Sequence, residues 1–270
     1  MDARLQLRVQ RYGWDHAAPH YEQAWSENLA PATLAVLNAA QLQAGERVLD
    51  VACGSGALTR AAWQAVAPGR GEVVGTDLSE QMLAAAAEQS PHGQFVRANA
   101  QDLDECLPAG HFDAVLCGLG LMYMPDPEAA LAAMVRRLRP GGRLLASVWG
   151  ERRACGWAEI FPIVDARVRS EVCPLFFRLG SGQALERALQ DAGLADVQAQ
   201  RLSTQIVFAD AQLACDAAFL GGPVALAYSR FDAPTREAVR SEYLEAIKVW
   251  RHEGSYRLPG EFVVASGRRP

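Results

Sequence analysis

The 270-residue sequence lacks the long apolar run that a membrane span requires. Half of its residues are hydrophobic, yet no stretch approaches about 20 uninterrupted apolar residues. The N-terminus, Met1 to Arg8, also lacks the apolar region of a secretory signal. We therefore expect a globular, cytoplasmic protein. The chain is long enough to bury a large core in one domain with insertions.

Further absences narrow the classes of function. The six cysteines are scattered without a C-x-x-C pair, so we expect reduced thiols. No His-Glu-x-x-His pattern occurs, and Pro19, between His16 and His20, disfavours one continuous helix there. We therefore expect no metal site. The net charge of −5, without a concentrated basic surface, argues against a nucleic-acid partner.

Strand and helix signals alternate along the chain in the order that builds β-α-β units, which predicts a mostly parallel sheet. Ser79 and Asp126 are N-cap residues, and Gly45 and Gly193 follow expected helix ends. The expected helices span residues 30–42, 57–67, 79–89, 127–139 and 183–191. The expected strands span residues 47–51, 72–76, 112–118, 143–149 and 261–266.

Two stretches, at about residues 150–180 and 205–258, interrupt this alternation. The first is rich in aromatic residues, and the second contains two helical segments, at 211–219 and 235–250. We expect both to cover a substrate site, although core packing explains any single aromatic residue better. No repeat or linker marks a second domain. The expected organisation is one domain over residues 1–270, with an N-terminal cover at about 1–44 and a core at about 45–150.

Residues 47–59 carry the most informative pattern: a short apolar strand that ends near a carboxylate, a turn with two glycines, and a helix. Gly54 and Gly56 lack a Cβ, so the backbone can turn sharply and a ligand can approach it closely. Asp50 can accept hydrogen bonds from a cationic amine. Asp77 follows the next strand, twenty-one residues past Gly56, where an acid reaches ribose hydroxyls. The pattern predicts a nucleotide-like ligand.

The dinucleotide pattern G-x-G-x-x-G is incomplete in this turn. Thr59 replaces a required glycine in one register, and Ala52 and Ala57 replace two in the other. A pyrophosphate needs the close approach that all three glycines provide, and Asp50 would repel it. An adenosyl ligand with a positive amine and no phosphate suits the turn better. An NAD-dependent oxidoreductase stays open as an alternative.

Five motifs in order resemble those of the class I S-adenosylmethionine-dependent methyltransferases. The closest likeness is to the small-molecule branch typified by the ubiquinone/menaquinone biosynthesis C-methyltransferases, and it is strong over about residues 45–150. The motifs are Val48 to Gly56, Asp77, Ala98 to Leu103, Phe112 to Gly118 and Leu138 to Arg143.

This resemblance implies an α/β, Rossmann-like fold with a mostly parallel seven-stranded sheet, helices on both faces and helical cover insertions. It implies S-adenosyl-L-methionine as cofactor and methyl transfer by in-line displacement at the sulfonium methyl. Asp50 and the turn would hold the methionine part, Asp77 the ribose, and Leu78 and Met82 the adenine face. The full set of cofactor-binding residues that it implies is Tyr21, Asp50, Ala52, Gly54, Ser55, Gly56, Asp77, Leu78, Met82, Asn99, Ala100, Gln101 and Cys117.

The chain departs from the family pattern at two of these positions. Asn99 stands where an aspartate is common, and its amide carbonyl can still accept a hydrogen bond from the adenine amino group. Ala52 stands where a glycine is often found, and its Cβ is tolerable if its φ stays negative. We therefore expect both positions to border the cofactor.

The sequence does not identify a catalytic residue, because a sulfonium methyl is already activated and needs chiefly alignment and exclusion of water. His16 and His20 are possible bases, and Tyr123 is a candidate wall of the substrate pocket. The apolar and aromatic covers predict a small, partly apolar organic acceptor. A third hypothesis is a regulatory protein that binds the cofactor without turnover.

Overall fold

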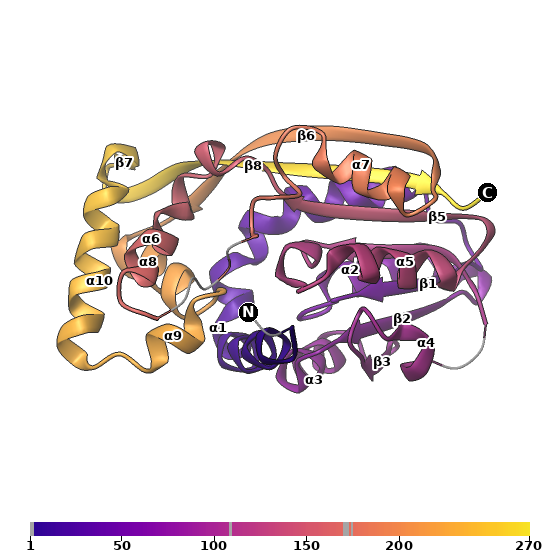
Figure 1. Ribbon diagram of the computed structural model, residues 1–270, viewed down its shortest axis with the longest axis horizontal. Coiled ribbons are helices and arrows are strands. Elements are labelled where there is room, and N and C mark those ends of the chain that lie inside the picture. The colour runs from indigo at the N-terminus through magenta and orange to yellow at the C-terminus, as the bar shows by residue number, and fades with distance from the viewer. Residues whose placement is uncertain (1–2, 108–109, 170–172, 174) are drawn as a thin grey trace.

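The computed structural model of the protein describes residues 3–107, 110–169, 173 and 175–270. Within these residues, one sheet has the strand order β3-β2-β1-β4-β5-β8-β6, and the short β7 pairs with β8 (Figure 1). The strands are β1 (Arg47–Val51), β2 (Glu72–Asp77), β3 (Gln94–Arg97), β4 (Phe112–Gly118), β5 (Leu138–Trp149), β6 (Ala195–Phe208), β7 (Arg251–His252) and β8 (Ser255–Arg268).

The five strands β1 to β5 are mutually parallel, whereas β8 runs antiparallel to both β5 and β6. The expected α/β, Rossmann-like, mostly parallel sheet is therefore confirmed. Seven strands lie on its main path, and β7 adds a two-residue pairing.

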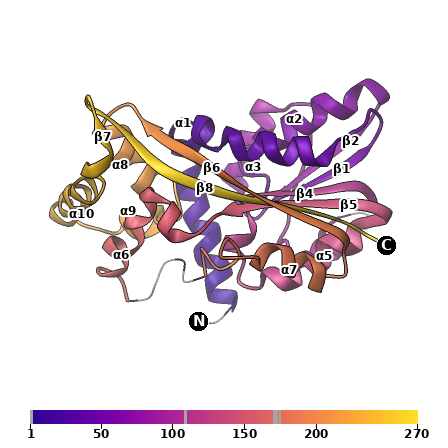
Figure 2. The ribbon, with the colours of Figure 1, turned by 90° about the horizontal axis from the view of Figure 1, so that it is seen from above.

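Helices cover both faces of the sheet, as expected. Figure 2 shows α2, α3 and part of α1 on one face, and α5 and α7 on the other. Because both faces are covered, the central strands are almost continuously apolar. The helices are α1 (Ala3–Ala40), α2 (Ala57–Val66), α3 (Glu80–Gln89), α4 (Leu103–Cys106), α5 (Pro127–Arg137), α6 (Ile160–Asp165), α7 (Ala184–Asp191), α8 (Ala211–Phe219), α9 (Ala225–Ser229) and α10 (Ala233–Ala246).

The capping signals in the sequence correctly located two helix starts. The Ser79 side chain accepts a hydrogen bond from the Met82 N–H at the start of α3. Asp126 likewise accepts from the Ala129 N–H at the start of α5. Because each cap satisfies an N–H group that the first turn leaves unpaired, it fixes where the helix begins.

The N-terminal segment differs from the expectation. A single 38-residue helix, α1, contains both Pro19 and Pro31, so the prediction that Pro19 breaks the helix between His16 and His20 is wrong. Each proline removes one backbone N–H, but α1 packs against α3, α8 and α9, and such packing outweighs a local preference. Figure 2 shows that α1 changes direction along its length, as proline-containing helices commonly do.

The sequence also missed strand structure near the C-terminus. Residues 195–208 form β6, which was not predicted, and β8 starts at Ser255, before the expected 261. The stretch 205–258 is therefore partly sheet, with α8, α9 and α10 inserted between β6 and β8. These helices lie beyond one end of the sheet (Figure 1). Within the described residues, no helix combines the length and apolarity needed to cross a membrane.

Candidate functional site

A cavity lies at the carboxyl ends of β1, β2 and β4, where crevices form in open parallel sheets. Its empty volume is about 1020 Å³, including the part that is open to solvent. One end is formed by the glycine turn and the loops after β2 and β3, and the other end is largely aromatic. The aromatic end contains Trp14, Tyr21, Trp25, Tyr123, Trp149 and Trp157.

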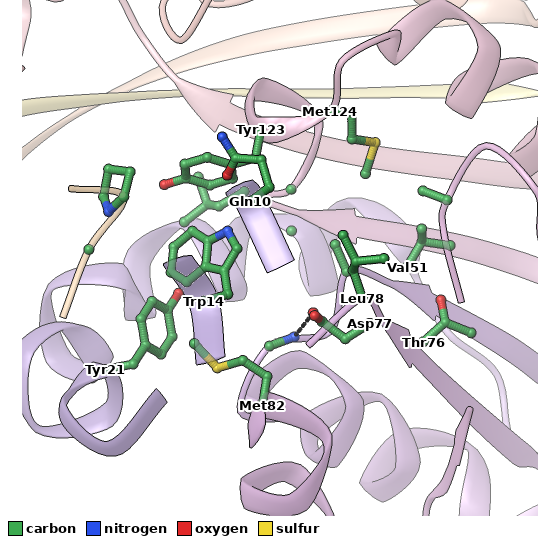
Figure 3. A pocket seen from close by; sticks show the side chains of 18 of the residues that line it. Gln10, Trp14, Tyr21, Val51, Thr76, Asp77, Leu78, Met82, Tyr123 and Met124 are labelled. Atoms are coloured by element: carbon green, nitrogen blue, oxygen red, sulfur yellow. Dashed lines mark hydrogen bonds between the residues drawn. The ribbon is translucent and has the colours of Figure 1, made fainter. Parts of the chain in front are cut away.

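Asp77 is held rigidly at the first end of the cavity. Its Oδ2 accepts a 2.9 Å hydrogen bond from the Gly54 N–H (Figure 3). Its Oδ1 accepts one of the same length from the Ser79 N–H. Burial raises the pKa of Asp77, against the lowering effect of these backbone hydrogen bonds. Each carboxylate oxygen keeps acceptor capacity beyond its one bond. Asp77 can therefore accept hydrogen bonds from two hydroxyls of a ligand.

The turn between β1 and α2 depends on left-handed backbone at three positions. Ala52, Gly54 and Gly56 have φ values of +56°, +54° and +85°. Ala52 therefore does not have the negative φ at which its Cβ would be tolerated without cost. Its backbone is strained. A Cβ at Gly54 would meet nothing within 4 Å, whereas one at Gly56 would lie 3.0 Å from the Ala86 Cβ. The turn is thus open at Gly54 and closely packed at Gly56.

Ala52→Gly is expected to stabilise the protein by about 1 kcal/mol, because glycine removes the steric cost of left-handed backbone. Gly54→Ala is the matched reverse change and should destabilise by a similar amount, since its added Cβ meets no neighbour. Urea denaturation of both variants measures the two free energies of unfolding. Equal and unchanged midpoints would show that the turn is not strained.

Asp50 lies beneath the turn rather than on the cavity wall. Its side chain is fully buried, and its Oδ2 accepts a 2.6 Å hydrogen bond from the Thr59 hydroxyl. Its Oδ1 is buried without a hydrogen-bond partner, which disfavours a charge there. Burial, with repulsion from Asp77, raises the pKa of Asp50 to about 7, although the Thr59 hydrogen bonds lower it. This geometry does not support the predicted contact between Asp50 and a cofactor amine.

Asp50→Asn is expected to flatten the pH dependence of stability. The folded pKa of Asp50, about 7, exceeds its unfolded value of about 4, so the folded state binds the proton more tightly. Wild-type stability should therefore fall as pH rises from about 4 to about 7, by about 1.4 kcal/mol per pKa unit. Asparagine cannot ionise, so its advantage over wild type should grow across this window. Parallel stability profiles for the two proteins would contradict the assignment.

The aromatic end of the cavity is built partly by α1. The Trp14 ring packs edge-on against Tyr21 and Tyr123, with centroids 5.7 and 4.8 Å away (Figure 3). Trp25 packs against Trp149 and Trp157. The α1 residues that line the cavity follow steps of three and four or their multiples, as one face of a helix does: Leu7, Gln10, Trp14, Tyr21, Trp25 and Leu29.

Two side-chain hydrogen bonds connect α1 to the loops of the core. The Ser79 hydroxyl donates to Asp15 Oδ1, and the Ser55 hydroxyl donates to Glu22 Oε2, both at 2.6 Å. Because Ser79 also caps α3 and Ser55 lies in the glycine turn, α1 is fixed directly over the loops that border the cavity.

The structure brings together most of the residues that were predicted to bind the cofactor, although their roles stay predictions. Ser55 lines a smaller neighbouring cavity. Gly56, Gln101, Cys117 and the already described Asp50 line neither cavity. Eight residues line the larger cavity: Tyr21, Ala52, Gly54, Asp77, Leu78, Met82, Asn99 and Ala100.

Hydrogen bonds within the loop after β3 fix its conformation. Asn99 Oδ1 accepts a hydrogen bond from the Gln101 N–H at 3.3 Å, and Asn99 Nδ2 donates to Asp102 at 2.6 Å. The Asn99 carbonyl therefore already has one partner within the loop and keeps one further acceptor site toward the cavity.

The candidate bases and thiols are not placed for chemistry in this cavity. His16 and His20 are exposed and do not line it, because they occupy another face of the continuous helix α1. Burial raises the pKa of Cys117 to about 12 and that of Cys53 well above its usual range. The six cysteines are free thiols, as expected. Tyr123 does line the cavity, as predicted.

Sequence reasoning missed Gln10, Trp14 and Trp25, because it began the first helix at residue 30. The signal was present in the regular spacing of large side chains through residues 7–29. The proline at position 19 obscured it.

Comparisons with known proteins agree with this fold. The model of the methyltransferase domain family matches residues 48–142. The ubiquinone/menaquinone biosynthesis C-methyltransferase UbiE of Pseudomonas fluorescens (strain Pf0-1) is 41% identical over 110 residues, which cover 38% of this chain and 42% of that protein. The chain thus spans less than half the length of this curated relative.

Two solved structures share the fold. The YcgJ protein from Bacillus subtilis has a TM-score of 0.60 and 16% sequence identity, over 89% of this chain and 98% of its own. Haemonchus contortus phosphoethanolamine N-methyltransferase 2, in a complex with S-adenosyl-L-methionine, has a TM-score of 0.59 and 17% identity, over 95% of this chain and 57% of its own. The predicted resemblance to class I methyltransferases is confirmed, and S-adenosyl-L-methionine is the cofactor of that class.

Proposed function

We propose that this protein transfers the methyl group of S-adenosyl-L-methionine to a small, partly apolar organic acceptor. The observation that carries the proposal is a single cavity with two chemically different ends. One end has the open turn and the fixed Asp77 carboxylate, and the other is aromatic. A cofactor and an acceptor can therefore meet within one cavity.

The first end fits the adenosyl part of the cofactor. Asp77 can accept hydrogen bonds from the two ribose hydroxyls, and Gly54 leaves open space beside the backbone. Leu78 and Met82 offer apolar surface to the adenine ring, and Asn99 offers a carbonyl at its edge. When bound, the cofactor supplies a methyl group on a positively charged sulfur.

Because this methyl group is already activated, the residues of the chain need chiefly to align the reacting atoms and to exclude water. At the aromatic end, the Trp14 ring packs against both Tyr21 and Tyr123, and the three side chains line the cavity. Aromatic faces attract cations such as a sulfonium, and an apolar surround keeps water from the methyl group. Alignment of this kind accounts for much of the rate of a displacement reaction.

The cavity offers no obvious general base. Its described lining contains no lysine, arginine or histidine. Burial raises the pKa of the phenols of Tyr21 and Tyr123, and Asp77 already accepts two backbone hydrogen bonds. We therefore expect an acceptor whose nucleophilic atom carries a free electron pair or releases its proton to water.

The test is incubation of the purified protein with S-adenosyl-L-methionine and a panel of small organic molecules, followed by mass spectrometry. We expect an added methyl group on compounds with an apolar or aromatic part, and none on highly charged ones. Cofactor binding without any methylated product across the panel would favour a regulatory protein instead. The cytoplasmic location expected from the sequence stays a prediction.

A further inference from the structure

A second, smaller cavity adjoins the first. Its empty volume is about 520 Å³, including space that is open to solvent. The two cavities share four lining residues, so they meet beside the glycine turn: Tyr21, Leu29, Gly118 and Leu119. Ser55 and Ala57, on either side of Gly56, line only the smaller one. A ligand that occupies the larger cavity can therefore extend past the turn into the smaller one.

The lining of the smaller cavity is mainly apolar but includes four hydroxyl-bearing residues and one charged residue. Hydroxyl groups of Ser26, Thr33, Ser55 and Ser147 line it, and Glu22 is the one charged side chain among its described lining residues. Glu22 Oε2 accepts the hydrogen bond from Ser55, and Ser55 is only 4% exposed. Glu22 Oε1 accepts no hydrogen bond from the described residues. A carboxylate thus faces the cavity with one oxygen available.

The cofactor carries an ammonium group at its methionine end, and that group needs an anionic partner. Asp50 cannot easily serve, because its side chain is fully buried and lines neither cavity. Glu22 lines the smaller cavity beside Ser55 of the turn. We propose that Glu22, on the covering helix α1, is the anion that receives the ammonium group of the bound cofactor. This inference rests on the proposed function and makes Glu22 a residue that positions the cofactor.

Two ligands separate this role from a purely structural one. S-adenosylhomocysteine has the ammonium group, whereas 5′-methylthioadenosine has the same nucleoside but no amino-acid end. Glu22→Gln keeps an oxygen that can accept the Ser55 hydrogen bond and removes only the charge. Glu27→Gln is the matched control, because Glu27 is exposed on the same helix and lines neither cavity.

Isothermal titration calorimetry of the full chain tests the proposal. For Glu22→Gln we expect the affinity for S-adenosylhomocysteine to fall about ten- to a hundredfold, as for loss of one charged hydrogen bond. Its affinity for 5′-methylthioadenosine should stay within about twofold of wild type, and Glu27→Gln should match wild type for both ligands.

Two results would overturn the role of Glu22 alone: unchanged affinity of Glu22→Gln for S-adenosylhomocysteine, or equal losses for both ligands. If wild type binds neither ligand, the proposed function fails together with this inference. Thermal unfolding of each variant shows whether it is folded before binding is compared.

Discussion

Asp77→Asn is expected to weaken the binding of S-adenosylhomocysteine about a hundredfold or more. The carboxylate accepts backbone hydrogen bonds from Gly54 and Ser79, and we expect it to accept two more from the ribose. Asparagine removes the charge that strengthens these bonds and replaces one acceptor with an N–H₂ donor. Two charged hydrogen bonds at about 1.5–3 kcal/mol each account for the size of the effect. Isothermal titration calorimetry measures it.

The control is Asp126→Asn, since Asp126 also accepts a backbone N–H at a helix start but lies outside both cavities. Asparagine is an equally good N-cap, so this variant should bind the ligand as wild type does. Asp77→Asn should also weaken the binding of 5′-methylthioadenosine, because that ligand keeps the ribose. A folded Asp77→Asn protein with wild-type affinity would show that Asp77 does not hold the ribose.

Gly56→Val is expected to lower the free energy of unfolding by about 3 to 5 kcal/mol. The φ of +85° at Gly56 strains any side chain, and a branched one most. The new Cβ would also lie 3.0 Å from the Ala86 Cβ and 3.2 Å from the Ala86 Cα, which adds the cost of overpacking. Urea denaturation monitored by circular dichroism measures the loss.

A double-mutant cycle separates the two causes of this loss. Ala86→Gly removes the nearest atom of α3, so Gly56→Val combined with Ala86→Gly should be less destabilised than the sum of the two single changes. The remaining loss measures the backbone strain. Strict additivity would mean that the turn moves away from α3 and that this contact does not restrain it.

The sequence predicted the core of the fold because its signals there are local. Caps at Ser79 and Asp126, and glycines at 54 and 56, determine their structure through backbone atoms within a few residues. The positions of Asp77 and the turn then follow, because parallel strands end at one edge of the sheet. Local sequence signals thus correctly located the glycine turn and Asp77 in the fold.

The face on which Asp50 lies could not be predicted in this way. Val48 and Asp50 point to the side of β1 that packs on α2, where Thr59 meets the carboxylate, whereas Val51 lines the cavity. Alternation determines which residues share a face. On a strand that is buried on both sides, it does not indicate which face the ligand occupies.

The covering helix and the last hairpin depend on contacts between distant segments. Pro19 locally disfavours a helix, and only the packing of α1 against α3, α8 and α9 keeps it continuous. The strand β6 is mostly exposed and polar, so it has little apolar alternation, and its pairing with β8 defines it. Local sequence patterns therefore predict neither the continuous helix α1 nor the strand β6.

We expect this cavity to bind an adenosyl ligand that carries a methionine end. Calorimetric titration of the wild-type protein with S-adenosylhomocysteine, and separately with NAD, tests it most directly. We predict saturable binding of one S-adenosylhomocysteine per chain and no heat of binding with NAD. Binding of NAD without binding of S-adenosylhomocysteine would show that the cavity is a dinucleotide site instead.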